Sequence, residues 1–577
     1  MNSLEIVRTR VANRNVWALV GEGALPGLRT SRVTTDRLEA LAVGKHEVAD
    51  HVERVMTALE LNGSERAATP GGADWLYVQR VPVRRLVTQL VRKLIVLDAW
   101  EPFARSPGPL TPVPHEALIG VRDTSAQEYR SYTVTWSGIA YLLGAPAPHN
   151  PFLPEPQEAV RRPGTASVPS HLRGAEVVAL SWSSRHWQTL LPVLHVLGKE
   201  GHRSVLVDLS SDPSQQCTAP LPPGVSMVSA PASLFSSTTV RRYASGTVGS
   251  HGPVVPVGTH KLRLNRLEQV VAALLECGGG CTQPSWDSVV RVERWLDEVL
   301  LSARPHTLLV ANDTSPLGAL AVHNAQHHAL NTVYVQHGAW SAEAVSWPAL
   351  HSRYIVVMGR RDAELASAWA RHPDAEVHVL GQPRFDALAR LDRKAQRRTL
   401  NRMITAERIV VWACQPFAPE RLTAHADLLR EGLAQAPGSW GLVVAPHPAQ
   451  NPDTFTHLLT RGSPPPVAIV PARDGARGVL AGADVLASAY STCGIEAALL
   501  KVPVLEIGPP SETTLGLAAH GLARRCVTPD DVAKALTETP VSRTSSAMEE
   551  VCRWRGTSAY DIAQLIIAKA PVHHNAL

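Results

Sequence analysis

Three short apolar segments, each followed by a polar motif, constrain the fold of this chain more than any other feature. Residues 331–336 (NTVYVQ), 441–445 (GLVVA) and 484–488 (DVLAS) have the length and the β-branched content of buried strands. Helical patterns follow them, which is typical of an open α/β sheet. Because ligands bind beyond the carboxyl ends of such strands, we expect the polar motifs to share one site. These motifs are Gln336-His337-Gly338, His447-Pro448 and Ser491-Thr492-Cys493-Gly494-Ile495-Glu496.

The third motif predicts a phosphate site. Tyr490, Ser491 and Thr492 precede a helix expected over about residues 494–500, starting at Gly494. A helix N-terminus offers free backbone N–H groups and a favourable dipole, to which two hydroxyl groups are added here. Glu496, one turn inside the helix, is suited to accept hydrogen bonds from the hydroxyls of a ribose. The alternative is an ordinary N-cap followed by an exposed glutamate.

The His447-Pro448 pair predicts a second contact with the same anion. Pro448 disfavours the α region at His447, so the histidine is expected in an extended turn just after its strand. From there the imidazole can donate to a phosphate oxygen when it is neutral and pair with it when protonated. A His-Pro pair alone is an ordinary loop. The Ser-Thr-x-Gly-x-Glu motif that follows it favours the phosphate interpretation.

Other strand ends supply further candidates for the crevice. Residues 176–180 (EVVAL) and 408–412 (RIVVW) read as strands, and the loops after them carry Ser183 and Ser184 in the first case and Gln415 in the second. A third strand at residues 307–310 is followed by Asp313. We expect these loops at the carboxyl edge of a parallel sheet, where Gln336 and Gly338 would also lie.

The order of the motifs resembles bacterial GT-B transferases of surface polysaccharides. The resemblance rests on QHG, on GQPRFD at residues 381–386, on His-Pro, and on ADVLASAYSTCGIEA at residues 483–497 with a following PVL. That group includes CDP-glycerol glycerophosphotransferases and the polysialic acid and Kdo transferases that use CMP-sugars. Hydrolysing UDP-GlcNAc 2-epimerases are more distant relatives. The similarity covers about residues 174–570, and the acidic motif of polysialyltransferases has no clear counterpart.

The resemblance implies an α/β fold of GT-B type, with two Rossmann-like domains facing a cleft and an N-terminal accessory domain of mixed, mainly helical character. The accessory domain with its proline-rich linker would cover residues 1–170. The acceptor-side domain would cover residues 171–385 and the nucleotide-donor domain residues 386–577. By resemblance His447, Ser491 and Thr492 would contact the donor phosphate, Glu496 the ribose, and His337 the reacting groups, with Arg384 of the GQPRFD motif also in the cleft.

The activity implied is metal-independent glycosyl transfer from a CMP-, CDP- or UDP-linked donor to a surface or capsular polysaccharide, without a cofactor. The alternatives are a CDP-alditol glycerophosphotransferase, an enzyme like the UDP-GlcNAc 2-epimerases, and a non-catalytic GT-B-like binding subunit. Sugar transfer needs a general base at the acceptor hydroxyl. His337 is the first candidate for this base and Asp313 the second. The alternative for His337 is a structural histidine that binds the loop backbone.

Composition fits a large cytoplasmic enzyme. Of the 577 residues 45% are hydrophobic, yet no apolar run is long enough to cross a bilayer. The N-terminal residues lack the apolar stretch of a secretory signal, and the seven cysteines contain no C-x-x-C pair. A net charge of +5 is mild for this length and does not indicate a nucleic-acid partner. Motifs for a GT-A metal site, a P-loop or a nucleophile elbow are absent from the sequence.

Residues 83–97 predict a basic amphipathic helix. Arg84, Arg85, Arg92 and Lys93 fall on one half of the helical wheel, and leucines and valines occupy the other. We expect the apolar stripe to pack on the core of its own domain. The alternative is peripheral contact with the cytoplasmic face of a membrane.

Overall fold

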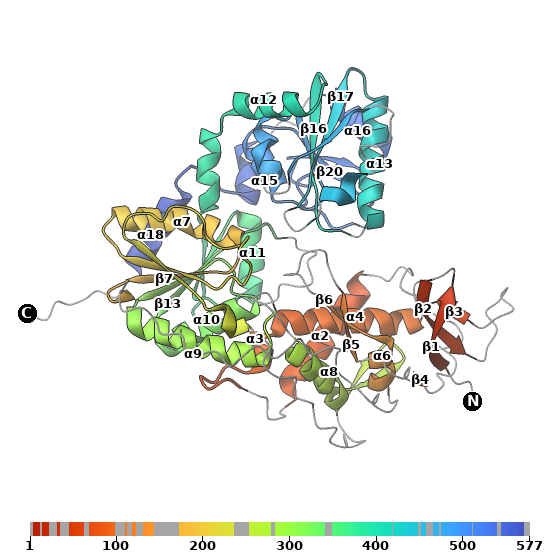
Figure 1. Cartoon of the computed structure of the whole chain (residues 1–577), viewed down its shortest axis with the longest axis vertical. Coiled ribbons are helices and arrows are strands. Elements are labelled where there is room, and N and C mark those ends of the chain that lie inside the picture. Colours follow the sequence, from red (N-terminus) through yellow and green to blue (C-terminus); the bar gives the residue numbers. More distant parts are fainter. Residues whose placement is uncertain are drawn as a thin grey trace, which may run out of the picture. The chain divides into compact units, whose positions relative to one another are not determined.

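In the computed structural model (Figure 1) the chain forms two compact units. Unit 1 comprises residues 1–168, 230–299 and 314–324, and unit 2 the remainder. The described residues are 4–11, 14–21, 32–34, 45–62, 68–98, 110–111, 118–122, 131–143, 172–235, 253–277, 283–340, 349–417, 419–447, 450, 452–456, 465–471, 475–510, 512–538 and 544–570.

Unit 1 mixes helices with small antiparallel sheets. Five of its six main helices pack into one apolar core together with two hairpins, β5–β6 and β10–β11, and Trp286 of the sixth packs against this core. The main helices are α2 (Lys45–Leu61), α3 (Trp75–Val78), α4 (Arg80–Asp98), α6 (Trp136–Leu142), α8 (Leu264–Cys277) and α9 (Trp286–Ala303). The strands are β1 (Leu4–Val11), β2 (Arg14–Gly21), β3 (Arg32–Thr34), β4 (Leu110–Thr111), β5 (Ile119–Arg122), β6 (Ser131–Val134), β10 (Val254–Val257) and β11 (His260–Arg263). Strands β10 and β11 and helix α8 therefore pack with the N-terminal block, although the sequence placed them in the next domain.

The basic amphipathic helix predicted over residues 83–97 is part of α4. Its apolar stripe is buried in the core of unit 1, from Val83 and Leu86 through Leu90 to Leu94. Arg84 on the other half is also buried and forms an ion pair with Glu53. The apolar stripe thus packs on the core of its own domain, as expected. Among the described side chains of the helix, no apolar face is left free to contact a membrane. In the part of the chain that the structure describes, no helix is both long and apolar enough to cross a membrane.

Unit 2 contains two parallel sheets. The first has the strand order β15-β14-β13-β12-β7-β8-β9, and all the pairings between neighbours are parallel. Numbered along the chain this is 7-6-5-4-1-2-3, the Rossmann order with one strand added at the edge. The strands are β7 (Val177–Ser181), β8 (Ser204–Asp208), β9 (Val225–Ser229), β12 (Thr307–Val310), β13 (Asn331–Val335), β14 (Tyr354–Val357) and β15 (Glu376–Val379).

The second sheet has the order β18-β17-β16-β19-β20-β21, again with parallel pairings throughout. Along the chain this reads 3-2-1-4-5-6, the Rossmann order itself. The strands are β16 (Arg408–Ala413), β17 (Trp440–Ala445), β18 (Val467–Ile469), β19 (Val485–Ser488), β20 (Val504–Ile507) and β21 (Arg524–Cys526). The α/β class with two Rossmann-like halves, expected from the sequence, is confirmed; the exact domain boundaries stay a prediction.

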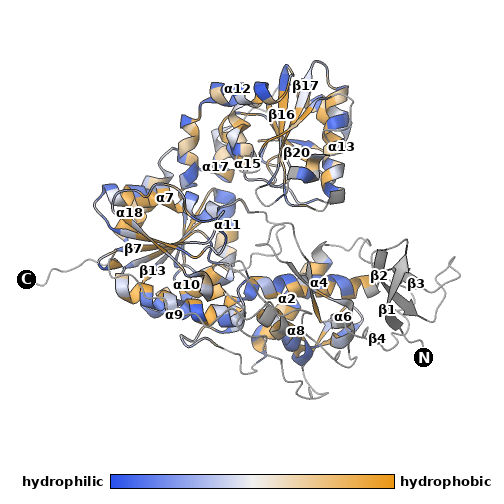
Figure 2. Cartoon of the chain, in the orientation of Figure 1, coloured by the Kyte–Doolittle hydropathy of each residue, from blue (hydrophilic) through white to orange (hydrophobic). Residues whose placement is uncertain are grey.

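Successive side chains of β16 point to opposite faces of the second sheet, and both faces are covered by helices. Ile409 and Val411 point into the core shared with α15, whereas Val410 and Trp412 point into the core shared with α13 and α16. Figure 2 shows the strands of both parallel sheets as largely hydrophobic and the helices around them as two-sided. The helices of unit 2 are α7 (Ser184–Lys199), α11 (Arg360–Trp369), α12 (Arg393–Met403), α13 (Pro419–Gln435), α15 (Cys493–Leu499), α16 (Pro529–Thr537), α17 (Ser545–Val551) and α18 (Ser558–Ala568). Helix α10 (Pro316–His327) belongs partly to each unit.

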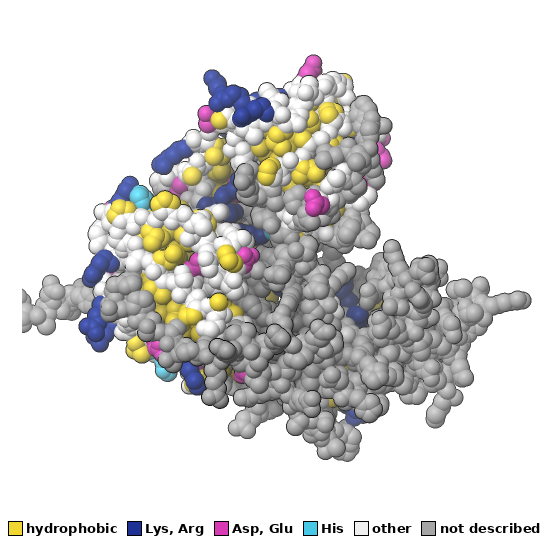
Figure 3. All heavy atoms as spheres, in the orientation of Figure 1, with side chains coloured by type: hydrophobic (Ala, Val, Ile, Leu, Met, Phe, Trp, Pro, Cys, Tyr) yellow, Lys and Arg dark blue, Asp and Glu magenta, His cyan; other side chains and the backbone are white. Residues whose placement is uncertain are grey.

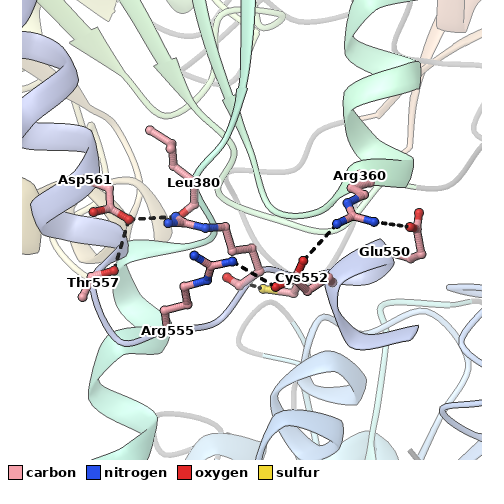
Figure 4. A network of polar contacts seen from close by, with 9 residues as sticks. Arg360, Leu380, Glu550, Cys552, Arg555, Thr557 and Asp561 are labelled. Carbon is pink, nitrogen blue, oxygen red and sulfur yellow. Dashed lines mark hydrogen bonds and ion pairs between the residues drawn. The ribbon is translucent and has the colours of Figure 1, made fainter. Parts of the chain in front are cut away.

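The C-terminal helix packs with the first sheet, whereas the sequence placed it in the second half. Ile562 and Ile566 of α18 are buried in the core that also holds side chains of β7, β12 and α7. Polar contacts fix the segment before α18: Arg553 donates to the carbonyl of Leu380 and pairs with Asp561, while Arg360 of α11 pairs with Glu549 and Glu550. Leu380, Asp561, Arg360 and Glu550 are labelled in Figure 4. The apolar face of α18 explains this position, because it completes the core of the first sheet.

Basic side chains gather over α12. Figure 3 shows Lys and Arg side chains on this helix, where Lys394, Arg398 and Arg402 are exposed. Its Arg397 is bound instead to Asp484, at 2.5 Å.

Candidate functional site

Several candidate residues flank the two points where strand order reverses, and His337 and His447 follow the neighbouring strands β13 and β17. In the first sheet this point is between β7 and β12, so the loops carrying Ser183 and Asp313 flank it. In the second sheet it is between β16 and β19, so the loops carrying Gln415 and Ser491 flank it. Ligands of open α/β sheets bind in the crevices at such points. The sequence thus placed these candidates in loops that flank the reversals, and their role in a site stays a prediction.

His337 follows β13 and is held by a hydrogen bond to the backbone. Its Nδ1 lies 2.6 Å from the carbonyl oxygen of Ala311, and because a carbonyl only accepts, Nδ1 carries the hydrogen. When the ring is neutral, its lone pair is therefore on Nε2. Burial, together with the charges of Arg185 and Arg384, lowers the pKa of His337 to about 4, although the bond to Ala311 acts in the opposite direction. His337 thus satisfies the loop backbone and also keeps a basic nitrogen.

A second histidine, His186, lies against His337. The two rings meet edge to face with their centroids 4.9 Å apart. His186 is in the first turn of α7 and is only 3% exposed. Burial, with the nearby His337 and Arg185, holds the pKa of His186 well below its usual value. Its neutral ring packs against the ring of His337.

Asp313, the second candidate for the base, binds backbone. One carboxylate oxygen accepts hydrogen bonds from the N–H groups of His351 and Ser352, at 2.9 and 2.8 Å. The side chain is fully buried, and burial raises the pKa of Asp313 to about 6. A carboxylate in this position joins β12 to the loop before β14. The carboxylate exposes no atom to the hydroxyl group of an acceptor substrate, so the geometry favours His337 as the general base.

Gln336 anchors the loop that carries His337. Its side chain is fully buried; its amide donates to Asp362 at 2.8 Å and to the carbonyl of Gly338 at 3.0 Å, and its oxygen accepts from the N–H of Met358. Gln336 was expected to face the crevice, but these contacts make it a residue that shapes the loop. At Gly338 the nearest atom to an added Cβ would be Thr492 Oγ1, at 4.0 Å, so the glycine is not required for space.

His447 follows β17 and contacts Arg185 of α7. Arg185 Nη2 lies 2.5 Å from His447 Nε2, and since arginine only donates, Nε2 is the acceptor. Burial and the charge of Arg185 lower the pKa of His447 to about 3. The backbone N–H of His447 donates to Gln450 Oε1, whose amide in turn donates to the carbonyl of Gln415. Pro448 lies outside the described residues.

The Ser491-Thr492 motif meets the loop of His337. Thr492 Oγ1 accepts a hydrogen bond from the N–H of Ala339 at 3.2 Å, and Ser491 Oγ accepts one from the N–H of Cys493 at 3.3 Å. A hydroxyl group that accepts in this way still carries a hydrogen to donate. Tyr490, next to it, packs partly buried against the core of the second sheet.

The helix N-terminus differs from the expectation in one respect. The N–H groups of Gly494, Ile495 and Glu496 bond to the carbonyls of Ser491 and Thr492, because the chain already turns at Thr492. These donors are thus used within the turn. The hydroxyls, rather than free backbone N–H groups, are what the motif offers to an anion.

Glu496 was expected to be either exposed or a ribose contact, and it is 1% exposed. Its Oε2 accepts from Arg477 Nε at 2.6 Å, and its Oε1 lies 3.6 Å from Arg384 Nη2. The exposed alternative is therefore wrong. Enclosed by two arginines, the carboxylate presents almost no surface to a ribose hydroxyl in this conformation.

The remaining candidates are Ser183 and Ser184. Ser183 is the N-cap of α7 without a capping side-chain bond, and Ser184 bonds through its N–H and hydroxyl to Gln215 Oε1. Arg185 and His186 lie in the same turn and make the closer contacts with the site.

The GQPRFD motif joins the parts of unit 2. Gln382 donates to the carbonyl of Gln336 at 2.7 Å, Phe385 is fully buried, and Asp386 accepts from the N–H groups of Ser558 and Ala559 at the start of α18.

Nothing in the sequence singled out Arg477 as a candidate site residue. It lies outside every motif, and only the fold brings it to Glu496.

No protein-family model matches the chain, and no curated protein matches it significantly. Solved structures do resemble it. The UDP-GlcNAc 2-epimerase of Methanocaldococcus jannaschii is 12% identical, with 68% of this chain and 99% of that chain covered and a TM-score of 0.43. MurG of Acinetobacter baumannii is 11% identical, with 68% and 99% covered and a TM-score of 0.38. The wall teichoic acid polymerase TagF is 10% identical, with 69% and 90% covered and a TM-score of 0.40.

Proposed function

We propose that this chain is a GT-B-type glycosyltransferase that takes a sugar from a nucleotide-activated donor. The contact between Ala339 and Thr492 supports this best, because it joins the loop of the candidate base to the hydroxyl motif of the second sheet. Both loops lie at strand-order reversals or next to them, where substrates bind in open α/β sheets. The acceptor would be a surface or capsular polysaccharide, and the nucleotide CMP, CDP or UDP. The cytoplasmic location stays a prediction.

In this proposal the donor phosphate binds at His447, Ser491 and Thr492. The two hydroxyls each keep one hydrogen to donate, and Arg185 supplies a positive charge at His447. A phosphate would replace the His447 ring as the acceptor for Arg185. The bond from the anomeric carbon to the donor phosphate breaks in the reaction, so donors that contact the departing nucleotide stabilise the negative charge that forms on it.

His337 would remove the proton from the acceptor hydroxyl. Its Nδ1 hydrogen is fixed on Ala311, so Nε2 is the nitrogen that takes the proton. A pKa of about 4 keeps the ring neutral at pH 7 but makes it a weak base. Binding of an anionic donor near Arg185 and Arg384 would offset their charges and raise the pKa of His337 towards the range useful for catalysis. The base would therefore become effective once the donor is bound.

Thermal unfolding with a panel of CMP, CDP, UDP, GDP and ADP tests the donor site. A nucleotide at a hundred times its dissociation constant adds about 2.7 kcal/mol to the free energy of unfolding. We expect a pyrimidine nucleotide to raise Tm, and the shift to disappear in His447→Ala while the unliganded Tm stays close to that of the wild type. No shift with any nucleotide would contradict the proposal. Release of UDP and an epimerised sugar from UDP-GlcNAc alone would favour the epimerase alternative instead.

A further inference from the structure

Two arginines and one glutamate form a cluster beside the hydroxyl motif. Arg384 comes from η3 (Pro383–Arg390), Arg477 from η5 (Ala476–Gly478) and Glu496 from α15. Arg384 is 10% exposed and Glu496 1%. Arg477 is about one-third exposed, at 34%, so the cluster is accessible from its side. Cys493, the residue after Thr492, lies close enough to interact electrostatically with both arginines.

The arginines have more hydrogen-bond donors than the glutamate can satisfy. Arg477 Nε and Arg384 Nη2 face its two oxygens, while the buried Arg384 Nε and Arg477 Nη2 have no acceptor among the described residues. A buried N–H group without an acceptor costs free energy. Guanidinium groups present their N–H groups in a fork that matches the two oxygens of a phosphate or carboxylate. An oxyanion would satisfy these donors.

The charges around the cluster also favour an anion. The charges of Arg477 and Arg185 both act on Arg384, and Glu496 is the carboxylate that pairs with Arg384 and Arg477 in the described part of the chain. Burial and the repulsion from Arg477 lower the pKa of Arg384 to about 10, so the guanidinium stays charged at neutral pH. His337 and His447 are neutral there. The site therefore has an excess of positive charge larger than one phosphodiester group would neutralise.

We propose that Arg384 and Arg477, oriented by Glu496, bind a second oxyanion of the donor, next to the phosphate held by His447, Ser491 and Thr492. This rests on the proposed function. The second oxyanion is either the β-phosphate of a nucleoside diphosphate or the carboxylate of an acidic sugar, which share the same chemistry. Glu496 is then a positioning residue that holds the two guanidinium groups, rather than a ribose contact.

Calorimetric titration of UMP, UDP, CMP and CDP into the full chain tests the proposal. For whichever nucleobase, uracil or cytosine, binds better, we expect the diphosphate to bind at least about tenfold more tightly than the monophosphate. This is the gain expected from one added charge-assisted contact. In Arg384→Gln and in Arg477→Gln this ratio should approach one, with monophosphate affinity within about threefold of wild type. Arg390→Gln, an exposed arginine at the end of the same η3 element, should keep the wild-type ratio.

A second titration identifies the source of the oxyanion. If the wild type does not prefer diphosphates, a CMP-linked sugar with a carboxylate should bind about tenfold more tightly than CMP, and both arginine variants should lose that preference. If Arg384→Gln does not fold, the more exposed Arg477→Gln carries the test. Preferences that remain unchanged in the variants would overturn the proposal and identify the cluster as structural. That result would leave the proposed function standing. If no nucleotide binds to the wild type, both the proposed function and this inference fail.

Discussion

The guanidinium of Arg185 donates a hydrogen bond to Nε2 of His447 over 2.5 Å. The two residues belong to different Rossmann-like halves of unit 2. Arg185 lies in the first turn of α7, which follows β7 of the first sheet, and His447 follows β17 of the second sheet. The charge of Arg185 also contributes to the low pKa values of His186 and His337. One exposed arginine thus helps to keep three histidines of the candidate site neutral.

Replacing Arg185 by glutamine should raise the pKa of His337 and His447 towards the ordinary value of about 6.5. The physical reason is the loss of a positive charge that disfavours protonation of both rings. Imidazole titration by NMR measures the two values. Lys199→Gln, at the exposed far end of the same helix, is the matched control and should leave them unchanged. Unchanged values in Arg185→Gln would mean that burial alone sets them.

The pH dependence of kcat/KM should distinguish His337 from Asp313 as the base. A base must be deprotonated, so activity is present above its pKa and is lost as the pH falls through it. With pKa values of about 4 for His337 and about 6 for Asp313, the acidic limb should lie near pH 4 if His337 acts. A limb near pH 6 that disappears in Asp313→Asn would assign the role to Asp313.

Thr492→Val should weaken donor binding, because it removes both the hydroxyl donor and the acceptor for the N–H of Ala339. An unpaired, partly buried N–H group also costs about 1–3 kcal/mol. Thr492→Ser keeps the hydroxyl and should bind the nucleotide nearly as well as the wild type. Titration of the nucleotide that gives the largest thermal shift provides the comparison. Equal affinity in the valine and serine variants would exclude a role for the hydroxyl.

Much of the fold and of the site was readable from strand ends. Short β-branched runs followed by polar motifs predicted the strands and the loops of His337, His447 and Ser491, because buried parallel strands need continuous apolar residues. The roles within the loops were harder to predict. Gln336 and Asp313 turned inward to satisfy backbone groups, and sequence spacing does not indicate which polar side chain will do so.

Contacts between distant segments were also beyond the sequence. Arg477 reaches Glu496 only through the fold, and α18 joins the first sheet although it follows the second. An amphipathic helix pattern shows that an apolar face will be buried, but does not identify the core that buries it. For the same reason the sequence left open whether the apolar stripe of α4 contacts a membrane. In the structure this stripe is buried in the core of unit 1.

Asp386→Ala should loosen α18 from the first sheet. The carboxylate accepts from the N–H groups of Ser558 and Ala559, at 3.1 and 2.8 Å, and losing such a cap costs about 0.5–2 kcal/mol. Hydrogen exchange should become faster in α18. As the control, Asp392→Ala removes the N-cap of α12 and should speed exchange in that helix only. Unaltered exchange in α18 would show that its apolar face alone holds it.

Parallel measurement of nucleotide binding and of transfer in His337→Ala and His447→Ala tests the central claim most directly. A lost general base typically reduces the rate 10²- to 10⁴-fold while the donor still binds. His337→Ala should therefore keep the nucleotide-induced rise in Tm and lose transfer, and His447→Ala should lose both. Transfer at a near wild-type rate in His337→Ala, or an intact thermal shift in His447→Ala, would contradict the account.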